Sequence, residues 1–166
     1  MNVDFFIKQI AMNKDQDKYV DEKVMTVKYI PYEEKNAKCE SIVKSTSIIK
    51  DEATGVEIYK RNTPAFNVFY NMTLISLYTN IEVDFEHILK DYNALEELGY
   101  IDLLLSHIPK KEYVAWSKMC EMVMDDYMEN NRSLIAYLDN RLGAIDKTAE
   151  SIAEVIKGVE TEINKE

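Results

Sequence analysis

Apolar residues recur at intervals of three and four along most of the chain, and this spacing is typical of amphipathic helices. Only four glycines and three prolines interrupt the pattern, so the helices are expected to be long. The pattern predicts helices over residues 3–12, 32–45, 63–80, 85–99 and 100–108, one from about 110 past 138, and one from 144 towards 164. We therefore expect a mainly α-helical bundle of about five to seven helices.

The same spacing predicts which side chains face the core. Phe5 and Phe6 would share the inner side of the first helix, and Ala37 would face inward from the second. The segment 65–80 is apolar almost all round and is expected to form the central, most buried helix. Thr63 is expected to cap this helix, because its hydroxyl can accept from a free backbone N–H and the proline after it suits the first helical position.

Residues 24–60 are expected to hold a small β element. The run VMTVKYI, residues 24–30, is rich in β-branched and aromatic residues, and Pro31 keeps it from being a central strand. Two shorter β-prone arms, 47–50 and 56–59, flank a turn that contains EATG. Two arms around such a turn predict a small hairpin.

The last segment carries a single narrow apolar stripe. Its members recur at steps of four and three: Ile145, Ala149, Ile152, Ile156, Val159 and Ile163. Such a stripe docks on its own domain, on a second copy of the chain or on a partner helix, and the spacing alone leaves the three open. We expect one helical domain with the small β element over residues 1–143, and an amphipathic docking or assembly helix over residues 144–166.

The formal net charge of −10 disfavours binding to nucleic acid or to anionic membranes, because Lys and Arg supply most of the affinity for phosphates. Acidic and basic residues balance over residues 1–61, so the excess acid lies in the rest of the chain, where it would steer a basic protein partner. No signal peptide and no apolar run long enough to span a bilayer is recognised. Two cysteines fit a reducing compartment. We expect a cytosolic protein with protein partners.

The stretch MCEMVMDDYMEN, residues 119–130, holds four carboxylates and three methionines besides Met119. On a helix, Cys120 and Tyr127 turn towards the core, whereas Glu121, Asp125 and Glu129 point away from it. An outward row of acids is a solvated face, a contact surface for a basic partner, or a site for a divalent ion. A catalytic carboxylate pair would need a sheltered pocket, which this row does not predict.

No motif in the chain points to catalysis or to a cofactor. Isolated glycines cannot form a phosphate-binding loop. His87 and His107 have no Cys or His at a zinc-binding spacing, and only the fold could bring Cys39 and Cys120 together. The sequence therefore predicts no catalytic, cofactor-binding or metal-binding residue, and we expect a protein that is not an enzyme.

Three stretches carry a family resemblance: KYIPYEEKNAKCESIV, NTPAFNVFYNMTLISLYTNIEVDF and LEELGYIDLLLSHIPKKEYVAWSKMCEMVMDDYMENNRS. The words YxPYEEK, NTP, LIxLYTxIE and IPxxEY occur in them in this order. Over roughly residues 18–140 the chain resembles small proteins of the virion-assembly gene module of tailed phages and prophages of Gram-positive bacteria. The resemblance implies a role in head, neck or tail morphogenesis and supplies no catalytic residue.

The resemblance implies a phage structural or morphogenesis protein that works through protein contacts, in the host cytoplasm during assembly or also in the virion. Its expected partners are tail, neck or capsid proteins. Two alternatives stay open: an acidic phage-encoded inhibitor of a host or anti-phage defence protein, and a small metal-dependent enzyme. We expect Glu121, Asp125 and Glu129 to meet a basic partner.

Self-association is the function expected of Ile152, Ile156 and Val159. If the stripe joins copies of the chain, replacing two apolar members by charge in Ile152→Asp plus Ile156→Asp should reduce the oligomer to smaller species. The mass of the purified protein, measured by light scattering during size exclusion, checks this. An oligomer of unchanged mass would remove the self-association hypothesis.

Overall fold

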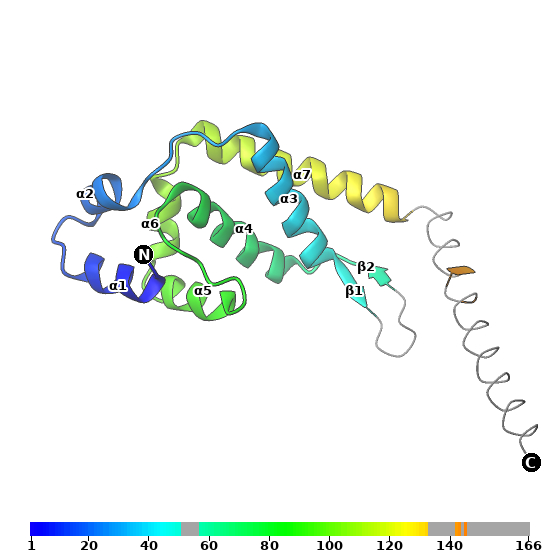
Figure 1. The fold of residues 1–166 in the computed structure, drawn as a ribbon, viewed down its shortest axis with the longest axis horizontal. Coiled ribbons are helices and arrows are strands. Elements are labelled where there is room, and N and C mark those ends of the chain that lie inside the picture. Colours follow the sequence, from blue (N-terminus) through cyan, green and yellow to red (C-terminus); the bar gives the residue numbers. More distant parts are fainter. Residues whose placement is uncertain (51–56, 133–141, 144, 146–166) are drawn as a thin grey trace, which may run out of the picture. The chain divides into compact units, whose positions relative to one another are not determined.

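The computed structural model describes residues 1–50, 57–132, 142–143 and 145 of the chain (Figure 1). Contacts divide the chain into two compact units: residues 1–47 with 61–125, and residues 48–60 with 126–166. The described part is mainly helical, which confirms the expected fold class. The expected domain boundary at residue 143 stays a prediction.

Seven α-helices and one π-helical segment occur within the described residues. They are α1 (Val3–Ala11), α2 (Gln16–Tyr19), η1 (Val20–Val24, the π-helix), α3 (Tyr32–Ser47), α4 (Thr63–Tyr78), α5 (Ile88–Glu96), α6 (Tyr100–Ser106) and α7 (Lys110–Arg132). The cap of α4 is Asn62, whose side chain accepts from the Ala65 N–H, so the expectation for Thr63 was one residue late. Gly99 adopts a positive φ of 71° between α5 and α6, a conformation that glycine reaches without steric cost.

The expected strand over residues 24–30 is wrong. Val24 ends the π-helix, and the segment after it meets the end of α4 only at points: Met25 forms an isolated bridge with Thr79, and the Thr26 N–H donates to the Tyr78 carbonyl. Its β-branched residues therefore fill space beside a helix end, and packing overrides their local preference. Farther on, Ile48–Lys50 (β1) pairs antiparallel with Glu57–Tyr59 (β2), three residues on each side. Because residues 24–30 form no strand, the predicted β element over residues 24–60 is not supported.

Helix α4 lies between two apolar clusters of the first unit, as its all-round apolar sequence predicts. Met72 and Ile75 face the cluster formed with α1, η1, α5 and α6. Leu74 and Tyr78 face the cluster formed with α3 and α7. All four side chains are fully buried, so α4 connects the two halves of this core.

Two side chains expected in the core are exposed. Phe5 on α1 is 51% exposed, and Ala37 on α3 also faces solvent. On α3 the buried face carries Lys35 and Cys39 instead. Ala37 lies about 200° around the helix from Lys35, so burial of one exposes the other. A lysine is usually exposed, so the sequence pattern alone does not indicate a buried face that includes Lys35.

The carboxylate of Glu112 on α7 is the polar centre of this core. Its Oε2 atom lies 2.7 Å from the Lys35 Nζ, accepts from the Tyr78 hydroxyl at 2.6 Å and accepts from the Ile30 N–H at 3.2 Å. Lys35 and Glu112 are 5% and 8% exposed. Burial and the neighbouring carboxylate raise the pKa of Tyr78, which keeps its hydroxyl a donor. Three separate segments are thereby fixed to α7.

Removing the cation of this pair should destabilise the protein strongly. In Lys35→Met the Glu112 carboxylate loses its counter-charge inside the core, which costs about 3–5 kcal/mol for a buried ion pair. Urea unfolding followed by circular dichroism measures the loss. The matched control is Lys38→Met, at an exposed position of the same helix, and equal stability of the two variants would contradict this account.

The same carboxylate should make stability depend on acid pH. Burial alone would raise the pKa of Glu112, but hydrogen bonds from Lys35, Tyr78 and the Ile30 N–H outweigh it and hold the pKa below its ordinary value. A group with a lowered folded-state pKa stabilises fully above its unfolded value of about 4.3, and this contribution is lost as the pH falls through the folded-state pKa. The unfolding free energy of Glu112→Gln should therefore fall less steeply between about pH 5 and pH 3 than that of the unsubstituted protein. Parallel curves would show that another group sets the acid sensitivity.

Candidate functional site

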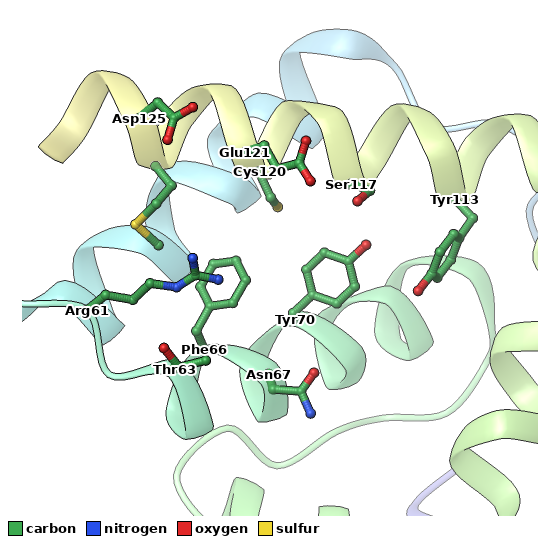
Figure 2. A pocket seen from close by; sticks show the side chains of 11 residues that line it. Arg61, Thr63, Phe66, Asn67, Tyr70, Tyr113, Ser117, Cys120, Glu121 and Asp125 are labelled. Carbon is green, nitrogen blue, oxygen red and sulfur yellow. The ribbon is translucent and has the colours of Figure 1, made fainter. Parts of the chain in front are cut away.

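A groove of about 390 Å³ opens on the first unit between α4 and α7 (Figure 2). It is the candidate site, because it brings aromatic, hydroxyl and charged side chains to one surface. Its lining residues come from α4, α7 and the residues before α4: Arg61, Thr63, Phe66, Asn67, Tyr70, Tyr113, Ser117, Cys120, Glu121, Met124 and Asp125.

The wall from α7 is a row of side chains at four-residue spacing. Tyr113, Ser117, Glu121 and Asp125 follow one another along the helix, and residues four apart lie on the same side of an α-helix. The acidic residues occupy one end of this row and the tyrosine the other (Figure 2). The groove therefore changes along its length from aromatic and hydroxyl-bearing to acidic.

The opposite wall is aromatic. Phe66 and Tyr70 lie on successive turns of α4 with ring centroids 5.9 Å apart. Tyr70 also contacts Tyr113 edge to face across the groove at 6.4 Å, and Trp116 beneath it at 6.0 Å. The guanidinium of Arg61 lies 4.7 Å from the Phe66 ring centre, at cation–π distance. These contacts hold the aromatic rings in place without a bound partner.

Tyr70 is a neutral hydroxyl at physiological pH. Burial raises the pKa of its phenol, with a further increase from Tyr113, and the hydrogen bond with Ser117 offsets only part of this. The charged side chains of the groove are therefore Arg61 at one wall, and Glu121 with Asp125 at the other. This mixture suits a ligand with an apolar body and at least one basic group.

Glu121 and Asp125 are exposed, as predicted, and both line the groove. Glu129 is also exposed but belongs to the second unit and is not a lining residue. The predicted self-association residues Ile152, Ile156 and Val159 lie outside the described residues, and their role stays a prediction.

The inner side of α7 matches the prediction in part. Cys120 is buried as expected, whereas Tyr127, also expected to turn inward, is half-buried. Trp116 and Met124 are buried as well, and the Met124 sulfur accepts a hydrogen bond from the Ser47 hydroxyl at the end of α3. Contact with α3 widens the buried face of α7 beyond the narrow sector that helical spacing indicates.

The two histidines lie on other surfaces of the first unit. His87 pairs with Asp84 at 2.8 Å, and His107 approaches Asp17 at 3.6 Å. The contact of Cys120 is instead with the Cys39 thiol, at 2.7 Å between the sulfur atoms. Within residues 1–50 and 57–132 no three His, Cys, Asp or Glu side chains converge in a way that could hold a metal ion.

Sequence reasoning found the acidic wall but missed the aromatic one. Phe66 and Tyr70 were assigned to a helix that is apolar all round, and nothing in that pattern indicates which side stays open. The four-residue spacing that continues from Asp125 back through Ser117 to Tyr113 marks one continuous face of α7, so it could have extended the acidic wall to Tyr113 but not revealed the wall from α4.

None of the helices described here is long and apolar enough to cross a membrane. No family model, curated protein or solved structure matches the chain. The chemistry of the groove itself is therefore the guide to what it binds.

Proposed function

We propose that the chain is a phage assembly protein that acts by binding and not by catalysis, and that the groove between α4 and α7 receives a segment of a phage tail, neck or capsid protein. The phage context comes from the resemblance of residues 18–140 to virion-assembly proteins. The observation that carries the binding role is the groove, where an aromatic wall faces Glu121 and Asp125.

The chemistry of the groove favours a peptide segment with an apolar anchor next to a Lys or Arg. Phe66 and Tyr70 offer ring faces to an aliphatic or aromatic side chain, and buried aromatic contacts supply much of the energy in protein interfaces. Asp125 and Glu121 attract the basic group, and the net charge of −10 assists the encounter.

Arg61 favours assembly over the rival function of an inhibitor that imitates nucleic acid. Such imitation needs a surface of uniform negative charge, because a nucleic-acid backbone repeats one sign of charge. In this groove the guanidinium of Arg61 belongs to the same surface as Glu121 and Asp125. A protein segment of mixed character fits that arrangement better.

Reversing one groove charge should weaken partner binding. Asp125→Lys places a cation where a basic partner residue is expected, and we expect affinity to fall about tenfold or more, as for like charges brought together at an interface. The matched control is Asp126→Lys, which makes the same charge change at the next exposed residue of α7 outside the groove lining. Its affinity should stay within about twofold of the unsubstituted chain.

The measurement is co-purification with the tail, neck and capsid proteins of the encoding phage, followed by titration of the protein that is retained. The fluorescence of Trp116, the single tryptophan, can report occupancy through its ring contact with Tyr70 of the groove wall. Equal loss of affinity in both variants would place the contact elsewhere on α7. Retention of a host nuclease, with no phage structural protein bound, would replace this proposal by the inhibitor.

A further inference from the structure

Cys39 and Cys120 form a pair of thiols inside the first unit. The residues are 81 positions apart in the sequence, but α3 and α7 bring their sulfur atoms to 2.7 Å. Both are free thiols, and both are buried. A disulfide holds its sulfurs about 2.05 Å apart, so the two atoms need to approach by only about 0.7 Å.

The two thiols differ in access. Cys120 lines the groove between α4 and α7, and its side chain extends from α7 towards α4 (Figure 2). Cys39 is fully buried on α3 and does not line the groove. A small reagent that enters the groove therefore meets the sulfur of Cys120 first.

We propose that Cys39 and Cys120 are a site of reversible oxidation, which a small disulfide such as oxidised glutathione converts into an intramolecular disulfide through the groove. The Cys120 thiolate attacks one sulfur of the small disulfide, which forms a mixed disulfide and releases the first glutathione thiolate. The Cys39 thiolate then attacks the Cys120 sulfur and releases the second. Two protein thiols lose two protons and two electrons, and one small disulfide becomes two thiols.

The geometry favours a disulfide over a metal site. Two thiolates on a tetrahedral zinc ion, each about 2.3 Å from the metal, lie about 3.8 Å apart. The Cys39 and Cys120 sulfurs are closer than that, and no third His, Cys, Asp or Glu of the described residues joins them in a metal-binding group. Contact between two sulfurs without further ligands is the arrangement that oxidation requires.

The reaction is expected to be slow at neutral pH. The hydrogen bond with Cys39 and burial both raise the pKa of the Cys120 thiol, and the thiolate is the reactive form. The pair therefore oxidises only on long exposure to an oxidising medium, and its oxidation state at equilibrium is set by its reduction potential against that of the medium. This inference does not depend on the proposed function.

The first test is oxidation of the reduced, full-length chain with oxidised glutathione at about pH 8.5, where thiolate forms more readily. After alkylation in denaturant, intact mass and peptide mapping should show the loss of two hydrogens, no alkylated cysteine, and one peptide joining Cys39 to Cys120. Dithiothreitol should restore both thiols. Two fully alkylated cysteines, under conditions that oxidise an unstructured cysteine peptide, would overturn the proposal.

Single variants test the route through the groove. Cys39→Ser keeps the thiol that lines the groove and removes the resolving one, so glutathione should accumulate on Cys120. Cys120→Ser should leave Cys39 largely unmodified under the same conditions. The reverse pattern would overturn the order of attack, and circular dichroism shows whether each variant retains the helical fold.

Thermal unfolding of the unsubstituted chain tests whether the disulfide fits the native contact between α3 and α7 or distorts it. A cross-link that encloses 81 positions constrains the unfolded chain, so oxidation should raise the unfolding midpoint by on the order of 10 °C. An unchanged or lower midpoint would show that the bond distorts the contact between α3 and α7, and would contradict a preformed site.

Discussion

The buried carboxylate of Glu112 is the constraint on which the first unit depends. A carboxylate removed from water is stable only when donors and a counter-charge replace the lost hydration. Here the donors come from three separate places: Lys35 on α3, Tyr78 at the end of α4 and the Ile30 N–H before α3. The carboxylate therefore sets how α3 and α4 meet α7. The groove has α4 and α7 as its walls, so its shape follows from the same contact.

Three of the four short sequence words of the family resemblance contain a residue of the Glu112 contact. YxPYEEK ends at Lys35, LIxLYTxIE contains Tyr78, and IPxxEY contains Glu112. Three words that lie far apart in the sequence thus meet at one carboxylate oxygen. In these three words, Lys35, Tyr78 and Glu112 thus hold the core together. Of the groove residues, Thr63 and Tyr113 lie within two of the words, whereas Phe66, Tyr70 and Asp125 lie outside all of them.

Local patterns predicted most of the helices because periodic apolar residues and caps act within one element. Gly99 and the start of α7 at Lys110 follow from such signals. The errors concern contacts between elements. Lys35 is buried because Glu112 lies opposite it, 77 positions later, and no local rule places a lysine inside. The acidic wall of the groove was predictable from helical spacing, whereas the wall from α4 depends on which side of an apolar helix stays uncovered.

Helix α7 carries a buried row and a groove-lining row that differ by a shift of one residue. Glu112, Trp116, Cys120 and Met124 recur every four residues and are buried. Tyr113, Ser117, Glu121 and Asp125 each follow one of them, and this second row lines the groove. Neighbouring residues differ by about 100° around a helix, so adjacent rows face different surroundings along the same axis. The groove row can therefore be substituted without removing the contacts by which the buried row meets α3 and α4. Cys120 and Met124 are where the two rows overlap, because both belong to the buried row and also line the groove. A disulfide between Cys39 and Cys120 would therefore change a buried contact with α3 and the lining of the groove at the same time.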